Sequence, residues 1–471
     1  MLPPTFPEWL GGSNFQQTHG TRFAYAAGSM ANGIATPELV ESLAHHGMLG
    51  FFGAAGLPFE RVEAGVAKIA SHLSGRGLPW GANLIHSPHE PALEIQSAKL
   101  FLERGVPCVE ASAYMTLTPA VVLAGVKGIA TRPDGSIARP RALFVKLSRP
   151  EVAQRFLSPP PSSLLNDLAD QGLLTQDEVH LAKRLPLATD VTVEADSGGH
   201  TDNRPLAALL PTIKVLWEEI RSRHQLDSRL RIGAAGGIGT PSAVAAAFAL
   251  GADYVVTGSL NQGAVESGLS ADGKAMLARA ELADVAMAAA ADMFELGVKV
   301  QVLRRGTLFA ARANRLYELY RSYDSIEALP DEVRKELEEI FRSSLDGIWE
   351  ETQAYWLRRE PEQAARALYE PHHKMALIFR WYLGMASRWA INGDESRRGD
   401  YQIWCGPAMG AFNAWTKGSF LESPGERTVV QIGLNLLEGA AVTSRAQQLR
   451  ACGVDVPSEA FCYRPRRLGV G

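Results

Sequence analysis

The chain has 471 residues, of which 46% are hydrophobic and 21% are charged, and its formal net charge is -4. This composition is typical of a soluble globular protein, and the slight negative charge excludes a general electrostatic attraction to nucleic acid or to an anionic membrane. The length exceeds that of one ordinary core, so we expect one domain of barrel size and a second, smaller domain.

The cysteines and the N-terminal residues indicate the compartment. Four cysteines are scattered without a Cys-x-x-Cys pair or any metal-ligand spacing, which is typical of free thiols in a reducing environment. The N-terminal segment MLPPTFPEWLGG has neither a basic nor an apolar region, so we expect no secretory signal. Apolar runs such as residues 244–250 are far shorter than the roughly 20 residues of a membrane helix. We therefore expect a cytoplasmic enzyme with no metal, nucleic-acid or membrane partner; the pattern leaves a homo-oligomer open.

Short runs rich in β-branched or aromatic residues alternate with longer amphipathic runs up to about residue 262. This alternation is typical of parallel βα units. The expected strands are residues 23–28, 48–53, 80–85, 108–113, 142–147, 190–194, 231–234 and 254–257. Eight strands close a barrel, so the expected fold class is an α/β (β/α)8 TIM barrel. A doubly wound sheet would also alternate, but no Gly-x-Gly-x-x-Gly follows an early strand.

Four residue pairs mark expected helix starts, because a hydroxyl residue followed by proline can cap a helix that has proline at its first position. They are Thr36-Pro37, Ser87-Pro88, Thr118-Pro119 and Thr240-Pro241. Residues 132–135 (RPDG) predict a tight turn in a small hairpin before the fifth strand. Residues 151–188 predict a helical insertion after that strand, with helices at about 164–171 and 176–185. We expect this insertion on the catalytic face, where barrel insertions commonly form lids.

From about residue 271 the pattern changes to long helices without a convincing strand. We therefore divide the chain into a barrel at 1–270 and a mostly helical C-terminal domain at 271–471. An aromatic set is interpreted as the core of that domain, with an acyl-chain or partner surface as the alternative: Trp381, Tyr382, Trp389, Trp404 and Trp415.

Two glycine pairs follow the last two expected barrel strands. Gly236-Gly237 comes after the seventh strand and Gly258-Ser259 after the eighth. In a (β/α)8 barrel these two loops form the usual phosphate site. The alternative is that the glycines only permit tight turns, but two pairs at the expected positions favour phosphate binding.

His200 and Lys146 are the candidate catalytic side chains. His200 follows residues 198–199 (Gly-Gly) just beyond the sixth strand, so its ring should project over the mouth of the barrel. A lone histidine is more often structural, but the neighbouring phosphate site favours proton transfer. Lys146, near the end of the fifth strand, is interpreted either as a snorkelling side chain or as a cation beside an anionic cofactor atom or oxyanion. Glu194 and Asp196 alternate along the sixth strand and could orient the loop.

Other polar groups lie in buried runs and need partners. Asn83 and His86 end the third strand and Glu110 lies on the fourth, so their partner is either a ligand or another loop. The small residues Ala27-Gly28-Ser29 end the first strand, where a flat ring could rest on the backbone or where the residues could simply pack.

Several segments resemble those of a known superfamily, the FMN-dependent (β/α)8 barrels of the nitronate monooxygenases and flavin enoyl reductases. Within it the chain is most similar to the PfaD-type trans-acting enoyl reductases of polyunsaturated fatty acid and trans-acyltransferase polyketide synthases. The matching segments are AGSMANGIA (27–35), GMLGFFG (47–53), VEADSGGH (193–200), AGGIG (235–239), TGS (257–259), DMFELGVKVQVL (292–303) and YQIWCGPAMGAF (401–412). The barrel motifs are shared across the superfamily, and the last two segments favour the reductase. The chain begins close to the first strand, so we do not expect the docking function of the N-terminal extension of longer relatives.

The resemblance implies an activity and its residues. NADPH would reduce FMN, and the hydride would then pass to the β-carbon of an α,β-unsaturated thioester on an acyl carrier protein of a polyketide or polyunsaturated fatty acid synthase. His200 would be the acid or oxyanion partner, with Lys146 as the second candidate. The expected cofactor-binding residues are Ala27, Gly28, Ser29, Asn83, Lys146, Gly199, Ala235, Gly236, Gly237, Gly258 and Ser259. The alternatives are a nitronate monooxygenase and a non-catalytic scaffold of a synthase assembly.

Overall fold

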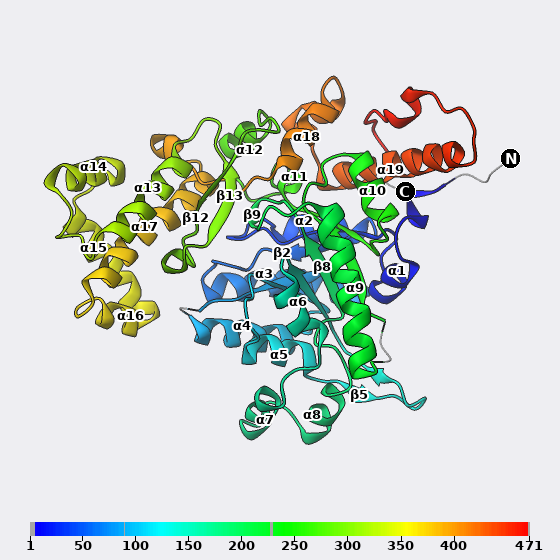
Figure 1. Ribbon diagram of the computed structural model, residues 1–471, viewed down its shortest axis with the longest axis horizontal. Helices are drawn as coiled ribbons and strands as arrows, with labels where there is room; N and C mark the ends of the chain where they lie inside the picture. The colour runs from blue at the N-terminus through cyan, green and yellow to red at the C-terminus, as the bar shows by residue number, and fades with distance from the viewer. Residues whose placement is uncertain (1–4, 89, 227–228, 470–471) are drawn as a thin grey trace.

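A closed barrel of eight parallel strands forms the centre of the computed structural model, which describes residues 5–88, 90–226 and 229–469 (Figure 1). The strands in order around the ring are β1 (Tyr25–Ala27), β11 (Val255–Thr257), β10 (Arg231–Ala235), β8 (Asp190–Glu194), β7 (Ala142–Leu147), β4 (Cys108–Ser112), β3 (Gly81–Ile85) and β2 (Leu49–Phe52). All eight strands expected from the sequence are present, with boundaries that agree within two residues. The (β/α)8 fold class is confirmed.

Both faces of the barrel strands are buried, which explains their nearly continuous apolar sequences. Along β7 the side chain of Phe144 packs inside the barrel, whereas Leu143 and Val145 belong to the core beneath the outer helices. Phe15, on α1 (Ser13–His19), joins the barrel interior and stacks on Tyr254 with ring centroids 4.5 Å apart. In the part of the chain that the structure describes, the barrel interior is therefore a packed core, which leaves its ends for ligands.

Helices surround the barrel and begin mostly where the sequence indicates. They are α2 (Pro37–His45), α3 (Phe59–Leu73), α4 (Pro91–Glu103), α5 (Pro119–Val126), α6 (Pro150–Leu157), α9 (Leu206–His224), α10 (Pro241–Ala249) and α11 (Ser259–Gln262). The hydroxyls of Thr36, Thr118 and Thr240 cap α2, α5 and α10 as expected. The cap expected at Ser87 is wrong, because α4 begins at Pro91 and Glu90 occupies its N-cap position. The Ser87 backbone N–H instead donates to the carboxylate of Glu94, in the first turn of α4.

The insertion after β7 lies at the opposite end of the barrel from the one expected. The hairpin β5 (Ala130–Thr131) and β6 (Ile137–Ala138) is confirmed, as are two short helices, α7 (Ser162–Asp170) and α8 (Gln176–Ala182). However, α6 first returns the chain to the amino ends of the strands, and only then do α7 and α8 form, next to α5 and β5 (Figure 1). The insertion therefore does not cover the carboxyl ends of the strands, where we expected it (Figure 1).

The segment after residue 270 contains strands that the sequence analysis did not predict. After α12 (Ala271–Leu277), β12 (Val285–Ala289) and β13 (Lys299–Leu303) pair antiparallel, and β13 also pairs with β9 (Gly199–His200). The alanine-rich sequence of β12 has low intrinsic strand propensity, and its pairing with β13 overrides that preference. This small sheet contains His200.

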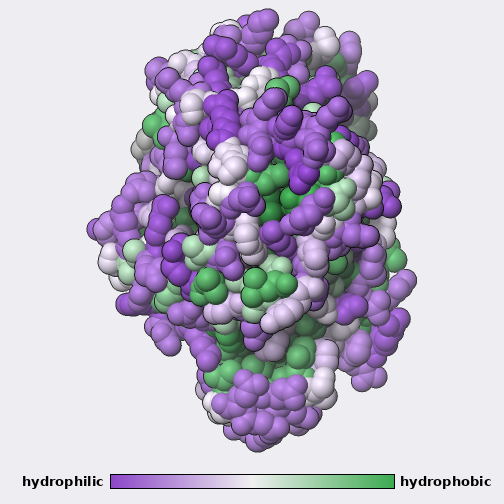
Figure 2. All heavy atoms as spheres, turned by 90° about the vertical axis from the view of Figure 1, so that its left-hand side faces the viewer, coloured by the Kyte–Doolittle hydropathy of each residue, from purple (hydrophilic) through white to green (hydrophobic). Residues whose placement is uncertain are grey.

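Five helices follow and form a lobe beside the mouth of the barrel (Figure 1). The helical lobe, residues 309–392, consists of α13 (Phe309–Ser322), α14 (Asp331–Phe341), α15 (Leu345–Arg359), α16 (Pro361–Arg366) and α17 (Pro371–Asn392). The face on this side of the molecule is mostly hydrophilic, with apolar side chains grouped in hollows between polar ones (Figure 2). Leu357, Leu368 and Tyr369 are large apolar residues that the lobe exposes.

The last helices return to the barrel. α18 (Pro407–Thr416) contacts α11, and α19 (Val429–Ala451) packs along α10 and also contacts α2. The residues after 270 thus lie in two places, the helical lobe and the outer layer of the barrel (Figure 1). Over the part of the chain that the structure describes, no helix is both long and apolar enough to cross a membrane.

Candidate active site

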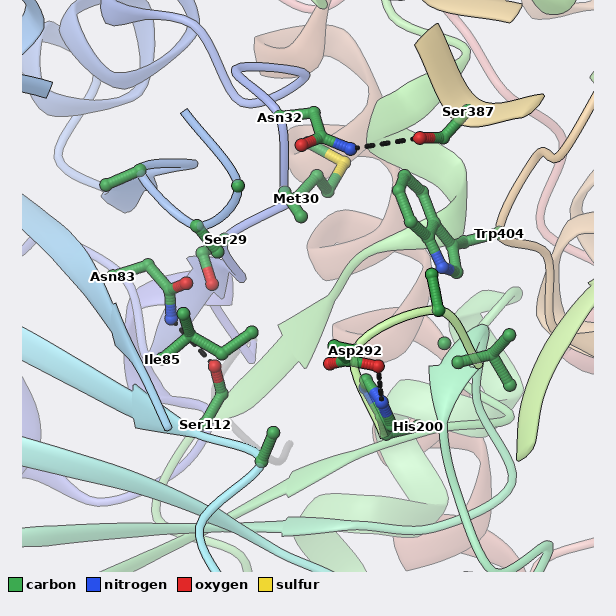
Figure 3. A pocket seen from close by; sticks show the side chains of 18 of the residues that line it. Ser29, Met30, Asn32, Asn83, Ile85, Ser112, His200, Asp292, Ser387 and Trp404 are labelled. Atoms are coloured by element: carbon green, nitrogen blue, oxygen red, sulfur yellow. Dashed lines mark hydrogen bonds and ion pairs between the residues drawn. The ribbon is translucent and has the colours of Figure 1, made fainter. Parts of the chain in front are cut away.

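A cavity of about 470 Å³ lies at the carboxyl ends of the barrel strands, between the barrel and the helical lobe. We call it the carboxyl-end cavity. Eleven of the twelve catalytic and cofactor-binding candidates line it: Gly28, Ser29, Asn83, Lys146, Gly199, His200, Ala235, Gly236, Gly237, Gly258 and Ser259. Ala27 does not, because its side chain is fully buried in the core. Figure 3 shows His200 and Asp292 on one side of this cavity and Asn83 and Ser112 across from them.

The glycines after β10 and β11 present free backbone donors to this cavity. Gly236 and Gly237 have φ values of +86° and +68°, in the left-handed region that favours glycine. Among the described residues, the backbone N–H groups of Gly236, Gly237, Gly258 and Ser259 have no protein acceptor. A Cβ added at Gly237 or Gly258 would meet no atom within 4 Å, so a side chain there would extend into the cavity. Small residues with unpaired N–H groups are the donor set that binds a phosphate.

The Gly236 turn packs closely against its neighbour. A Cβ on Gly236 would lie 2.6 Å from the backbone carbon of Ala195, which only glycine avoids. The hydroxyl of Ser259 accepts a hydrogen bond from the Gly406 backbone N–H at 3.1 Å, which ties the second loop to the start of α18. Both loops are thereby held in place before any ligand binds.

His200 forms an ion pair with an acid that the sequence analysis did not single out. His200 Nε2 lies 3.2 Å from Asp292 Oδ1, and the two side chains are 31% and 39% exposed. Burial lowers the pKa of His200, but the charge and hydrogen bond of Asp292 outweigh that effect and raise it. Burial raises the pKa of the Asp292 carboxyl, but the charge and hydrogen bond of His200 outweigh burial and lower it. The pair therefore keeps His200 protonated to a higher pH than a free imidazole.

Lys146 forms an ion pair with Glu194 rather than snorkelling to solvent. Its Nζ is 3.2 Å from Glu194 Oε1, and its side chain is 15% exposed. Burial opposes the charged ammonium, but Glu194 and Glu110 outweigh burial and raise the pKa of Lys146. Burial also raises the pKa of Glu110. The charge of Lys146 lowers that pKa but does not outweigh burial. The cation is thus fixed at the end of β7, on the floor of the cavity.

The ends of β1 and β3 are joined through β4. The backbone N–H and the hydroxyl of Ser29 both donate to Glu110 Oε2, whereas Glu110 Oε1 is buried without a partner. The Asn83 amide nitrogen donates to the Glu110 carbonyl and to Ser112 Oγ, each at 2.9 Å (Figure 3). Its NH2 group is therefore used within the protein, and its carbonyl oxygen is left for a ligand or solvent.

His86 has a structural partner instead of a ligand. Its Nδ1 lies 3.2 Å from Glu94 Oε2, and its ring stacks on Tyr114. Glu94 also accepts from the hydroxyls of Tyr114 and Thr118. This carboxylate thus organises the loop that forms one wall of the cavity.

The helical lobe supplies the remaining wall. Asn32 Nδ2 donates to Ser387 Oγ at 3.3 Å, which links the loop after β1 to α17 across the cavity (Figure 3). The aromatic set expected to form a core is divided: Tyr382 and Trp389 are buried, whereas Trp381 and Trp404 line the cavity. Trp415 packs against the core and donates its indole N–H to the Tyr463 carbonyl.

Comparison with known proteins agrees with this geometry. Residues 13–318 match the nitronate monooxygenase family model, and residues 323–401 match the inserted helical domain of [acyl-carrier-protein] S-malonyltransferase. The chain belongs to the nitronate monooxygenase family. The family resemblance expected from the sequence is confirmed, and the second matched segment covers α14 to α17 of the helical lobe.

Relatives of high identity come from lipid and polyketide synthesis. The chain is 44% identical over 467 residues to a polyunsaturated fatty acid synthase subunit of a Thraustochytrium species, and the match covers 97% of this chain and 31% of that protein. It is 44% identical over 436 residues to the polyketide biosynthesis protein PksE of Bacillus subtilis, covering 92% of this chain and 56% of that protein. The chain thus spans less than two thirds of the length of either relative.

A solved structure matches nearly the whole chain. The enoyl reductase domain of MlnA, from the macrolactin biosynthesis cluster of Bacillus amyloliquefaciens, superposes with a TM-score of 0.89 at 36% identity, covering 94% of this chain and 99% of that one. FabK from Thermotoga maritima, at 18% identity and a TM-score of 0.53, shares the fold alone.

Proposed function

We propose that the chain is an FMN-dependent enoyl reductase that uses NADPH to reduce the α,β double bond of a thioester carried by an acyl carrier protein. The observation that carries the proposal is the shared cavity, which is lined by the His200–Asp292 ion pair and by the two glycine loops with their unpaired backbone N–H groups. The MlnA enoyl reductase domain and the synthase relatives support the same reaction class.

The residues fit FMN by their chemistry. Gly236, Gly237, Gly258 and Ser259 would hold its phosphate, because their N–H groups are free and the glycines leave space for it. The small residues at Gly28 and Ser29 leave room for a ring at the end of β1. When bound, FMN would supply the hydride chemistry and NADPH the reducing equivalents.

The protein must handle a proton and a developing negative charge. Reduction adds a hydride at the β-carbon and a proton at the α-carbon, with charge building on the thioester oxygen. We assign to His200 the donation of that proton or a hydrogen bond to that oxygen, and Asp292 supports either role because it pairs with the ring and raises its pKa. Lys146 is neutralised by Glu194 and Glu110, so we assign it to positioning and to the local field rather than to proton transfer.

The synthase setting follows from the relatives. PksE and the fatty acid synthase subunits are named as parts of polyketide and polyunsaturated fatty acid synthesis. We propose that this chain acts on the carrier protein of such a synthase, with the thioester entering between the barrel and the helical lobe.

The test begins with the absorbance spectrum of the purified protein, which should show bound flavin. NADPH oxidation should then depend on an enoyl thioester presented on carrier protein. His200→Ala should retain flavin and lose turnover by about 10²-fold or more. His45→Ala, an exposed histidine on α2, is the matched control and should retain full activity. Turnover of a nitroalkane with oxygen and without NADPH would favour a nitronate monooxygenase, and a colourless protein would favour a scaffold.

A further inference from the structure

A second cavity, of about 900 Å³, lies at the amino ends of the barrel strands. Its lining includes Cys108, Ala142 and Arg231, the first residues of β4, β7 and β10. Figure 1 shows α7, α8 and β5 at this end, away from the helical lobe. We call it the amino-end cavity. The reductase chemistry proposed above uses the other end of the barrel, so this cavity has no role in it.

The lining of the amino-end cavity is strongly basic. Seven arginines and lysines line it: Arg132, Arg139, Arg141, Lys183, Arg184, Arg229 and Arg231. No aspartate or glutamate occurs among the lining residues that the structure describes, although the whole chain has a net charge of -4. A concave surface of one sign concentrates the field and attracts ions of the opposite sign.

One of these cations is already neutralised. Asp190, behind the cavity wall, accepts two hydrogen bonds from Arg231, at 2.5 and 2.8 Å, and lies 3.0 Å from His19 Nε2. Arg231 and His19 thus form a closed structural group with Asp190. The net positive charge of the cavity lining therefore comes from the other arginines and lysines.

Arg139 and Arg141 are half-buried guanidinium groups without a carboxylate partner among the described residues. Arg139 donates to the carbonyls of Leu187, at 2.9 Å, and of Pro186. Arg141 donates to the Lys127 carbonyl at 2.9 Å, and its Nε is buried with no partner. Burial lowers the pKa of Arg139 to about 10 and also lowers that of Arg141. The charge of Asp190 partly opposes this effect at Arg139, whereas burial is the sole cause at Arg141. Buried charges are normally paired, so the Arg141 guanidinium lacks an anion among the described residues.

The ligand can be identified by class from these donors. The planar fork of a guanidinium matches phosphate and carboxylate oxygens, and phosphate carries the higher charge. Lys183 and Arg184 follow α8 at the exposed rim and form no ion pair among the described residues, so they can meet a second anionic group. The cavity volume is within the range of small-molecule sites.

We propose that the amino-end cavity binds a small molecule bearing at least two phosphate groups, with Arg139 and Arg141 holding one of them and Lys183 and Arg184 the other. The site is separate from the carboxyl-end cavity and does not depend on the reductase function. It uses the insertion after β7, whose α8 carries the rim residues to this end of the barrel.

Isothermal titration of the full, flavin-saturated chain with inorganic pyrophosphate, at constant ionic strength, tests the proposal. Binding to one site is expected, and Arg141→Gln and the double variant Lys183→Ser/Arg184→Ser should each weaken it at least about tenfold. The rim variant keeps the proposal testable if Arg141→Gln fails to fold, because both rim side chains are exposed. Lys335→Ser/Arg358→Ser, which removes two exposed cations of the helical lobe, is the matched control and should bind like the wild type.

Three results would overturn the proposal. The first is the absence of pyrophosphate binding at millimolar concentration. The second is an affinity of the rim variant equal to that of the wild type. The third is a loss of affinity in the control variant as large as the loss in the rim variant. Binding of an acidic carrier protein that the rim variant loses, without pyrophosphate binding, would instead make this end a protein-docking surface. Bound flavin is measured separately from absorbance, so failure here is distinguishable from failure of the proposed reductase function.

Discussion

His200 Nε2 lies 3.2 Å from Asp292 Oδ1, and this contact joins β9, which follows the barrel strand β8, to the segment between β12 and β13. The register of the small sheet of β9, β12 and β13 produces the contact, because His200 pairs with Val300 and Gly199 with Gln301. Gln301 is anchored in turn, since its amide donates to Asp196 and to the Ser197 carbonyl, each at 2.7 Å. The loop that carries His200 is therefore held by residues about a hundred positions later in the chain.

Asp292→Asn should move the pH profile of the reductase reaction. Asp292 raises the pKa of His200, so the protonated imidazole persists to higher pH in the wild type. If protonated His200 is required, activity falls as pH rises through that raised pKa, and removing the carboxylate shifts the fall to lower pH. We expect a larger loss of kcat at pH 8 than at pH 6, measured by NADPH oxidation with a carrier-bound enoyl thioester.

The control for this variant is Asp324→Asn, an exposed carboxylate after α13, which should leave the profile unchanged. A uniform loss across the pH range in Asp292→Asn would mean that Asp292 only supports the loop. An unchanged profile would remove the pair from the mechanism.

The barrel could be predicted because its signals are local. Apolar runs of strand length and threonine-proline caps act within a few residues, and Thr36, Thr118 and Thr240 cap as expected. The glycine loops follow from their positions after the last two strands. The features that the sequence did not predict depend on pairing between segments far apart in the chain. Asp292 reaches His200 because β13 pairs with β9. The alanine-rich β12 has a composition that equally suits a helix, and it becomes a strand by pairing with β13.

The position of the insertion illustrates the same limit. Its two helices were expected from local pattern and are present. These helices lie at the amino ends of the strands because α6 first returns the chain to that end. The amino-acid composition of the insertion does not predict this return. Lys183 and Arg184 consequently face the amino-end cavity and not the carboxyl-end cavity.

Gly258→Val should release the flavin without unfolding the protein. Gly258 has a φ of -124°, which other residues adopt, and its added side chain would enter the carboxyl-end cavity where the phosphate is proposed to bind. Flavin content, measured by absorbance after purification, should fall at least about tenfold, whereas the far-UV circular dichroism spectrum should not change. Gly75→Val, at an open position on the surface, is the matched control. Full flavin content in Gly258→Val would contradict the phosphate assignment.

Glu94→Gln should make the free energy of unfolding depend less on pH in the acidic range. Burial raises the pKa of Glu94, but hydrogen bonds from His86, Thr118, Ser87 and Tyr114 outweigh burial and lower it. A carboxyl with a lowered folded pKa contributes stability above its unfolded pKa and loses that contribution as pH falls through the folded pKa. We expect a loss of about 2 kcal/mol in the free energy of unfolding at pH 7, shrinking toward pH 3, by urea titration.

The matched control for Glu94 is Glu63→Gln, which breaks an exposed ion pair with Arg104. Such pairs contribute about 0 to 1 kcal/mol, so this variant should stay close to the wild type at every pH. A deficit of Glu94→Gln that is the same at pH 7 and pH 3 would assign the loss to packing and not to the charge.

Gly384→Leu should narrow the cavity on the side of the helical lobe while leaving the fold intact. Gly384 lies within α17 and lines the carboxyl-end cavity, and a Cβ there would meet no atom within 4 Å. Leucine is favoured over glycine inside a helix by up to about 1 kcal/mol, so the melting temperature should stay the same or rise. If the acyl chain extends toward α17, the KM for a long-chain enoyl thioester should rise at least about fivefold, with little change for a four-carbon one. Gly384→Ala adds only a methyl group and should have a much smaller effect. Equal KM changes for both chain lengths would place the acyl chain elsewhere in the cavity.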